Sequence, residues 1–469
     1  MSKYAILAVL VAVSGLAFPG SSAAQKLIFV SSDGDDGNSC GRADPCRTVR
    51  RAEQLAQPGD TVQIDAGVYA GAITLTKSGT AARKITYRGH SGQCASTINA
   101  DPHAPSTRPN PSAITDGWIV EASHIVIDCF RIRPRTVALG VSITGVGRGS
   151  NAAINRSYID VVNNYVEFEG YNCAAGISFV SSGELSSMST HIYVANNFIT
   201  GCAYGISIRA TNSVVQDNEV YRLRAWDGAG DMDYMRLFGT DLSIRGNYLH
   251  GNRVADCNGE ECHIDCFQTF NLNGAEWAKL QNVSIDRNTC FNAHQGILMQ
   301  DVSRGNPGRP SGSHDNITVT NNVIGLGPAG SAMVWCMLFN SITNVSTLHN
   351  TCVSGQVRYR ANSTGIHRNN LHRVETRSPA ASDGTGSVTI TNNLFYNPSF
   401  VFDGAEWPGN IVNINPLFRD AANNDYSLTP NSPAIKAGAD LGVREDRNAK
   451  PRPAAYPDIG AYQLNPFKP

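Results

Sequence analysis

Five segments of the chain share an apolar position, which in most of them is the Ile of a Gly-Ile pair. When the segments are aligned on this position, acidic and basic side chains come together. In this alignment Asp233 falls beside Asp265, and Arg236 falls beside Gln268 of the next segment, on one face that we expect to be exposed to solvent. Two carboxylates this close repel each other unless a cation or a shared proton relieves the repulsion. The juxtaposition therefore indicates a site for acid–base chemistry or for cation binding.

Further polar side chains border these residues. His263 lies two residues before Asp265, and His294 directly precedes Gln295, the residue that aligns with Asp265. An imidazole can act as a general base or bind a substrate. The expected catalytic group is Asp233, Arg236, His263 and Asp265. The expected substrate-binding group is Gln268, His294, Gln295 and Trp226, where Trp226 is either a sugar platform or a core residue.

Calcium is the metal that such a group would hold, because Ca²⁺ prefers oxygen ligands. Its expected ligands are Asp231, Asp233 and Asp265. Zinc is disfavoured, since the chain has no paired CxxC or histidine spacing typical of zinc sites. We therefore expect either Ca²⁺ or no cofactor.

A sequence repeat predicts the elements that position this group. Its pattern is apolar, any, apolar, any, one or two Asn, then an apolar pair. Clear copies carry Asn197, Asn247, Asn288, Asn322 and Asn393, and weaker copies carry Asn164, Asn218, Asn350 and Asn370. Repeats of 20 to 50 residues are typical of solenoids, and the apolar–polar alternation predicts strands. An Asn at each corner tolerates a left-handed backbone, and its amide can bond to the equivalent Asn of the next coil.

Stacked coils of short strands rich in Val and Ile resemble the pectin-lyase-like superfamily. The segment from Phe29 to Tyr69 and the tail from Ser432 to Tyr462 are similar to the ends of many secreted bacterial β-helix proteins. The resemblance implies an all-β fold, a single-stranded right-handed parallel β-helix with a short N-terminal capping helix. It does not fix the activity, because this superfamily includes lyases, hydrolases, esterases, epimerases and adhesins.

The chain divides into four expected parts: a signal peptide (1–24), an N-terminal segment with a cap helix at 47–56 (25–59), the β-helix (60–435) and a closing segment (436–469). Lys3, a short apolar run and small residues before Gln25 are typical of a secretory signal. The run is shorter than the ~20 residues of a spanning helix. We expect a secreted or periplasmic protein, free of the membrane after cleavage.

Because disulfides persist in oxidising compartments, export predicts that the 12 cysteines form disulfides. The expected pairs are Cys40–Cys46, Cys173–Cys202 and Cys257–Cys262; the other six cysteines have no assigned partner. The net charge of -1 and the pI of about 6.8 argue against a nucleic-acid partner. We expect a monomer whose partner is a polysaccharide.

Four functions are compatible with these residues. The first choice is a polysaccharide lyase acting by β-elimination on an acidic glycan, which the resemblance implies would use Ca²⁺ and an arginine or lysine base. No Lys lies between Lys84 and Lys279, so the base would be Arg236 or His263. A glycoside hydrolase would instead use Asp233 and Asp265 as acid and base. A uronan epimerase and a non-catalytic glycan-binding protein are the remaining alternatives.

Overall fold

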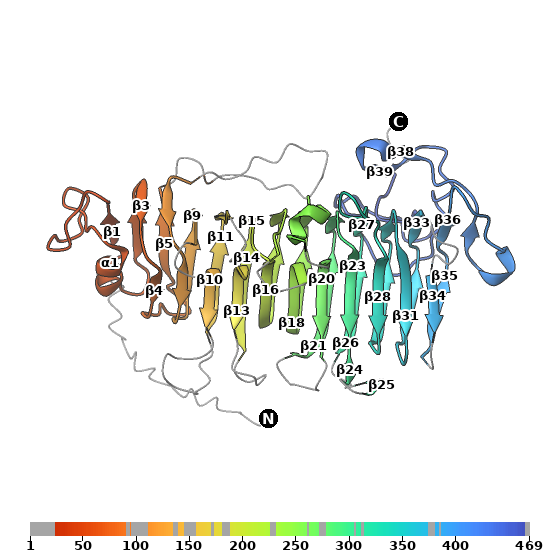
Figure 1. The fold of residues 1–469 in the computed structure, drawn as a ribbon, viewed down its shortest axis with the longest axis horizontal. Helices are drawn as coiled ribbons and strands as arrows, with labels where there is room; N and C mark the ends of the chain where they lie inside the picture. The colour runs from red at the N-terminus through yellow and green to blue at the C-terminus, as the bar shows by residue number, and fades with distance from the viewer. Residues whose placement is uncertain are drawn as a thin grey trace, which may run out of the picture.

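The protein is a stack of coils that runs along the long axis of the molecule (Figure 1). The computed structural model describes residues 24–90, 94, 111–134, 139–144, 156–169, 173–180, 188–225, 231–259, 262–271, 278–303, 306–310, 314–373, 380–383 and 386–464. Within these residues, strands of successive coils pair in parallel and in register, which gives each coil three faces.

Three series of strands form these faces, and they are listed in chain order. The first comprises β4 (Ile73–Leu75), β7 (Trp118–Val120), β10 (Leu139–Thr144), β13 (Ala175–Val180), the first parts of β16 (Tyr204–Gln216) and β18 (Asp231–Arg245), β20 (His263–Phe270), β23 (Gln295–Gln300), β28 (Trp335–Asn340), β31 (Gln356–Arg360) and β34 (Ala380–Asp383). The second comprises β1 (Leu27–Val30), β2 (Thr61–Ile64), β5 (Ile85–Gly89), β8 (Ile125–Asp128), β11 (Ser157–Val162), β14 (Ser189–Ala195), the second parts of β16 and β18, β21 (Leu280–Asp286), β26 (His314–Thr320), β29 (Thr343–Leu348), β32 (Gly365–Arg368) and β35 (Val388–Thr391). The third comprises β3 (Gly67–Tyr69), β6 (Ala113–Thr115), β9 (Arg131–Ile132), β12 (Tyr165–Glu167), β15 (Phe198–Thr200), β17 (Glu219–Tyr221), β19 (Tyr248–His250), β22 (Thr289–Phe291), β27 (Val323–Gly325), β30 (Thr351–Cys352), β33 (Leu371–Arg373), β36 (Leu394–Tyr396) and β37 (Ile411–Val412).

The other elements are short. Two antiparallel pairs, β24 (Val302–Ser303) with β25 (Asn306–Pro310) and β38 (Phe418–Asp420) with β39 (Asp425–Leu428), lie outside the stack, as do 3-10 turns at Val254–Cys257, Gly404–Glu406 and Ala421–Asn423. The helix expected at 47–56 is α1 (Val49–Leu55), which starts after the N-cap Thr48. Its capping role stays a prediction. No helix in the described ranges reaches the length and hydrophobicity of a membrane span.

The interior is filled by aligned apolar side chains. At one position of the first series, six consecutive coils carry buried residues in register, namely Ile177, Ile206, Met235, Phe267, Ile297 and Met337. The residue directly before this position also faces inward, where a side chain would have to fit between the first and third series. A Cβ added at Gly205 would lie 2.4 Å from Val220, and one at Gly296 would lie 2.3 Å from Ile324. Only a residue without a side chain fits at these two coils.

A continuous ladder of asparagines fixes the corner between the second and third series. The backbone N–H of each Asn donates to the side-chain oxygen of the Asn one coil further on, at 2.8–3.0 Å, through Asn164, Asn197, Asn218, Asn247, Asn288, Asn322, Asn350, Asn370, Asn393 and Asn410. The prediction that the repeated Asn residues occupy equivalent corners is confirmed. Because each amide bonds both neighbouring coils, the ladder sets their register.

Six disulfides join all 12 cysteines. The three expected pairs, Cys40–Cys46, Cys173–Cys202 and Cys257–Cys262, are confirmed. The three unassigned pairs are Cys94–Cys129, Cys266–Cys290 and Cys336–Cys352. Cys266–Cys290 and Cys336–Cys352 each link the first series to the third within one coil. This number of disulfides is typical of a protein that resides outside the reducing cytosol, in the periplasm or the extracellular space.

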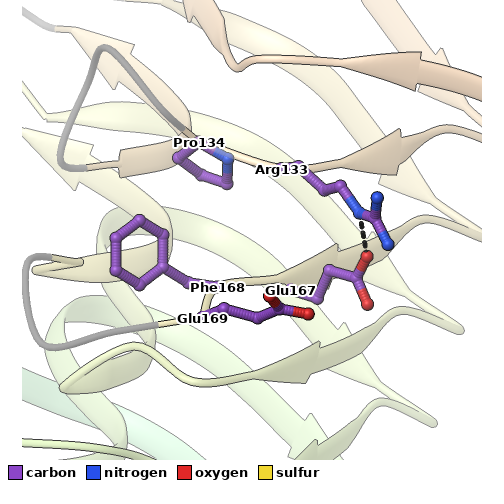
Figure 2. A pocket seen from close by; sticks show the side chains of 5 residues that line it. All are labelled: Arg133, Pro134, Glu167, Phe168 and Glu169. Carbon is purple, nitrogen blue, oxygen red and sulfur yellow. Dashed lines mark hydrogen bonds and ion pairs between the residues drawn. The ribbon is translucent and has the colours of Figure 1, made fainter. Parts of the chain in front are cut away.

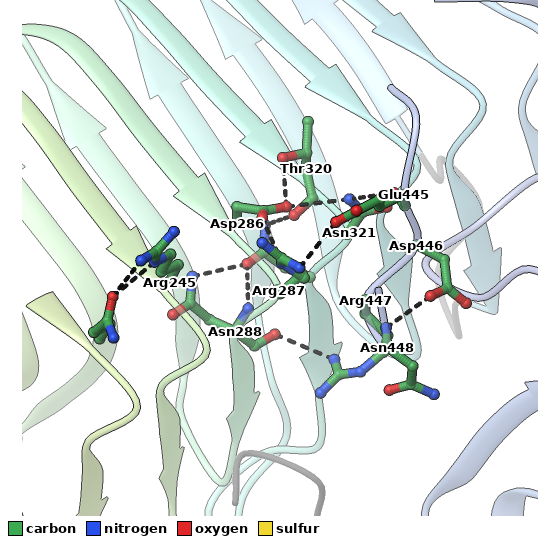
Figure 3. Close-up of polar contacts among 12 residues, drawn as sticks. Arg245, Asp286, Arg287, Asn288, Thr320, Asn321, Glu445, Asp446, Arg447 and Asn448 are labelled. Atoms are coloured by element: carbon green, nitrogen blue, oxygen red, sulfur yellow. Dashed lines mark hydrogen bonds and ion pairs between the residues drawn. The ribbon is translucent and has the colours of Figure 1, made fainter. Parts of the chain in front are cut away.

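The C-terminal segment returns to the asparagine corner and binds it (Figure 3). Arg447 donates to the Thr289 hydroxyl at 2.6 Å, and Arg452 donates to the Asn321 side chain at 2.9 Å. Asn321 in turn donates to the Glu445 carbonyl at 3.1 Å. Both arginines are at most 9% exposed. The end of the chain is therefore attached to coils more than a hundred residues earlier.

The asparagine ladder should contribute directly to stability. In Asn288→Ala, the buried N–H of Asn247 loses its acceptor, and an unsatisfied buried donor costs about 1–3 kcal/mol. We expect the free energy of unfolding, measured by denaturant titration, to fall by at least that amount. Asn410→Ala is the matched control at the half-buried end of the ladder, where water can replace the lost group. Equal losses in both variants would contradict this role.

Candidate functional site

The strand register brings the predicted acidic residues together. Asp233 of β18 pairs with Asp265 of β20, and Arg236 pairs with Gln268 on the same two strands. Gln295 of β23 follows Asp265 in the next coil. The alignment on the apolar position is thus confirmed, and its rows are neighbouring positions on the outer side of the first series.

The expected exposure of this group is wrong for its centre. Asp233 and Asp265 are both 0% exposed, and Gln268 is 7% exposed. Polar side chains of the same two strands contact both carboxyls and help to remove them from water. Asp231 and His263, at the start of the two strands, are the members that reach solvent, with side chains 43% and 60% exposed.

Each buried carboxyl is bound by the residue three positions later on its own strand. The Arg236 Nε group forms a short ion pair with Asp233, and its Nη2 contacts Asp231 at 3.2 Å. The Gln268 amide donates to Asp265 at 3.0 Å. One oxygen of each carboxyl and the Gln268 carbonyl oxygen are buried without a hydrogen-bond partner. Unsatisfied buried acceptors are unfavourable, so these oxygens are suited to take up a proton or another ligand.

The backbone under the pair is fixed from inside the coil. Tyr234, next to Asp233, is fully buried, and its hydroxyl accepts from the Asn252 N–H at 3.2 Å. Cys266, next to Asp265, is bonded to Cys290 of the third series. The two carboxyls are therefore held in place by anchored neighbours, as preorganised functional groups usually are.

Burial and mutual repulsion favour protonation of the pair. Burial raises the pKa of Asp233 to about 7, although Arg236 opposes the shift. Burial and the neighbouring charge of Asp233 raise the pKa of Asp265 well above its ordinary value. Asp233, which has the guanidinium partner, is the more easily ionised of the two. Burial alone would lower the pKa of Arg236, but Asp233 raises it, so Arg236 stays a cation.

The two histidines lie at the edge of this group. His263 Nδ1 lies 3.9 Å from Asp231. His294 is half-buried, and burial together with the nearby His263 lowers its pKa. Gln295 is 8% exposed. Trp226, the fourth expected substrate-binding residue, lies outside the described residues.

The expected calcium ligands do not form a metal-binding group as they stand. Among the described residues no three or more His, Cys, Asp or Glu side chains are placed to hold a metal ion. Two of the three expected ligands, Asp231 and Asp233, already contact the Arg236 guanidinium. The positive charge beside the carboxyls is supplied by this arginine. Calcium binding stays a prediction.

One member of the site was missed. The Arg236 guanidinium carbon lies 3.8 Å from the ring centroid of Tyr204, on the preceding coil, and 5.6 Å from that of Phe270. Cation–π contacts of this kind hold a guanidinium flat against the ring. Tyr204 precedes Asp233 in the same aligned column, so the repeat alignment contained the signal.

A hollow of about 350 Å³ opens on an earlier part of the stack (Figure 2). It is lined by Arg133 and Pro134, which follow β9, and by Glu167, Phe168 and Glu169 at the end of β12. These residues belong to weak copies of the repeat, and the sequence did not single them out.

Comparisons with known proteins agree on the architecture. No protein-family model matches the sequence. An uncharacterised Bacillus subtilis protein, YwoF, is 22% identical over 451 residues, which cover 87% of this chain and 92% of YwoF. A structure of XylC with xylose superposes with a TM-score of 0.55 at 10% identity, covering 94% of this chain and 98% of XylC. The pectate lyase Pel9A gives a TM-score of 0.49 at 15% identity and covers 95% and 98% of the two chains.

Identities this low speak only to the fold. Parallel pairing of successive coils is the feature that the sequence resemblance implied, and the asparagine corner is the feature that the repeat predicted. The chain therefore has the parallel β-helix fold of the pectin-lyase-like superfamily.

Proposed function

We propose that the protein is an exported carbohydrate-active enzyme that cleaves a polysaccharide at the start of β18, β20 and β23. The observation that supports this most strongly is the in-register pair Asp233–Asp265, two wholly buried carboxyls with raised pKa values. A pair of titratable groups with unequal environments is the usual arrangement for one acid and one base.

The side chains that bind Asp233 and Asp265 suggest which carboxyl is the acid and which is the base. Asp265 is bound by the neutral Gln268 and keeps its proton, so it is the acid that protonates the leaving oxygen. Asp233 is bound by the cationic Arg236 and ionises more readily, so it is the base that activates water. Because both carboxyls are covered, the substrate must displace a contacting side chain.

This assignment favours hydrolysis over the elimination that the sequence put first. A guanidinium held by Asp231 and Asp233 remains protonated and is a poor base. Elimination stays a second candidate because His263 is exposed and lies beside Asp231. The two reactions differ in product: elimination leaves an unsaturated, ultraviolet-absorbing uronate, whereas hydrolysis releases reducing ends without that absorbance.

The carboxyl pair should be essential for turnover. We expect Asp233→Asn and Asp265→Asn to lower kcat by about 10²–10⁴-fold, the usual contribution of general acid–base catalysis. Reducing ends and ultraviolet absorbance would be measured on a panel of neutral and acidic polysaccharides. Asp241→Asn, an exposed carboxyl on the second part of the same strand, is the matched control. Full activity in both pair variants would place catalysis elsewhere.

Treatment with a calcium chelator distinguishes an acid–base pair from a calcium site. If the pair works through its shared proton, incubation with a calcium chelator should leave turnover of the native enzyme unchanged, and added Ca²⁺ should not raise it. Loss of turnover with the chelator, restored by Ca²⁺, would instead assign the buried oxygens of Asp233 and Asp265 to a cation.

Arg236 should tune the base rather than act as one. Arg236→Lys keeps the positive charge but not the planar fork that contacts two carboxylates, so we expect lower kcat with an unmoved acidic limb of the pH–rate profile. Arg236→Gln removes the charge, which raises the pKa of Asp233 and moves that limb to higher pH. Complete inactivity of both variants at every pH would contradict this role.

The pair should also make stability depend on pH. A carboxyl with a raised folded-state pKa stabilises the fold below its unfolded pKa, and this contribution is lost as the pH rises through its folded pKa, about 7 for Asp233. We expect the unfolding temperature to decline from about pH 4, near the ordinary carboxyl pKa, through about pH 7, the folded pKa of Asp233. Asp265→Asn removes the repulsion and should flatten that decline, whereas the control Asp241→Asn should not. Parallel profiles for all three proteins would show that the pair holds no extra proton.

A further inference from the structure

We propose that the hollow between the ends of β9 and β12 is a distal sugar-binding subsite of the same groove, and that it holds one uncharged pyranose ring of the polysaccharide. Its volume of about 350 Å³ lies within the usual range for small-ligand sites, ~300–1,000 Å³. This inference rests on the proposed function for the class of ligand.

The two sides of the hollow offer different chemistry (Figure 2). Pro134 and Phe168 come from neighbouring coils and supply apolar surface. Arg133 and Glu167 form a short ion pair across the same two coils, and Glu169 lies beside them. An apolar surface next to charged donors and acceptors suits a sugar, which has C–H faces and a rim of hydroxyls.

The charged residues around the hollow favour a sugar ring that carries no charge. Glu167 accepts from both Arg131, at 2.7 Å, and Arg133. Burial would raise the pKa of Glu167, but the two arginines lower it, so it remains ionised. The second carboxylate, Glu169, balances the second arginine. Among the described residues around the hollow, two arginines and two glutamates leave no net charge to attract a uronate, while the ionised groups disfavour a purely apolar ligand.

The position of the hollow along the stack links it to the carboxyl pair. β9 and β12 are the third-series strands that precede β10 and β13 of the first series, and Asp231 is the first residue of β18 in that first series. The strands β10, β13, β16, β18 and β20 are consecutive neighbours in the sheet. Three strand spacings of ~4.8 Å separate the two places, or about 14 Å. A single extended glycan can reach both.

The Arg133–Glu167 ion pair also fixes the positions of polar side chains that line the hollow. Arg133 contacts Glu167 through its Nε atom, and a guanidinium has further N–H donors that can serve hydroxyl groups. Arg131, on the other side of Glu167, lies 5.4 Å from the ring of Tyr165. The Glu167 carboxylate is thus held by two guanidinium groups before any ligand arrives, which limits the entropy lost on binding.

Affinity electrophoresis tests the subsite separately from catalysis. The protein would carry Asp265→Asn, so that turnover does not cut the ligand, and would be run in gels containing xylan, glucomannan or galactan as neutral probes and polygalacturonate or alginate as acidic probes. We expect retardation in at least one neutral gel. Adding Phe168→Ala or Glu169→Gln should reduce that retardation at least tenfold in apparent affinity.

Two controls keep the result interpretable. Tyr456→Ala removes an aromatic ring that is 65% exposed elsewhere and should leave retardation unchanged. Glu169 is exposed, so its variant tests the hollow even if Phe168→Ala unfolds. No retardation in any gel, retardation in acidic gels alone, or equal retardation with and without both changes would overturn the subsite. Loss of the subsite with intact dependence on Asp233 and Asp265 would leave the proposed function standing.

Discussion

Register between coils is the constraint on which the rest of this molecule depends. Parallel strands repeat at ~4.8 Å, so any residue that recurs at one position of the coil is stacked on its equivalents. The asparagine ladder, with bonds of 2.8–3.0 Å from Asn164 to Asn410, fixes this alignment along almost the whole stack. Asp233 meets Asp265 because the coils cannot slip against each other. A shift of one residue would turn one carboxyl away from the other.

The site combines two unfavourable arrangements that partly relieve each other. A buried carboxyl and a buried guanidinium are each costly to remove from water, and Asp233 and Arg236 are paired for that reason. Among the described residues no cation pairs with Asp265, and the Gln268 amide is its observed donor. The asymmetry between these partners, more than the presence of two acids, gives the two carboxyls different proton affinities. The rings of Tyr204 and Phe270 hold the arginine within this arrangement.

Much of the fold was predictable because the coils of a solenoid have similar structures, so the sequence repeats from coil to coil. The apolar alternation and the corner Asn residues predicted the strands and their stacking, and the alignment on the Gly-Ile position predicted the neighbours of Asp233. Short spacing predicted Cys40–Cys46 and Cys257–Cys262. Burial of the acidic pair was missed, because exposure depends on side chains from other coils that the repeat does not specify. Cys266–Cys290 was missed for a similar reason. It joins the first series to the third, and the alternation of a strand does not predict that Cys266 and its neighbour Phe267 are both buried.

The attachment of the C-terminal segment to the asparagine corner has a consequence for how the chain matures. A simple solenoid contacts only adjacent repeats and can unravel coil by coil from an open end. Here Arg447 and Arg452 bind Thr289 and Asn321, so a segment that is synthesised after these coils closes over coils made much earlier. Until these contacts form, the middle coils lack part of their hydrogen bonding. Synthesis of this segment is therefore needed before the middle coils are fully bonded: a product that stops before Arg447 would carry most of the coils without these contacts.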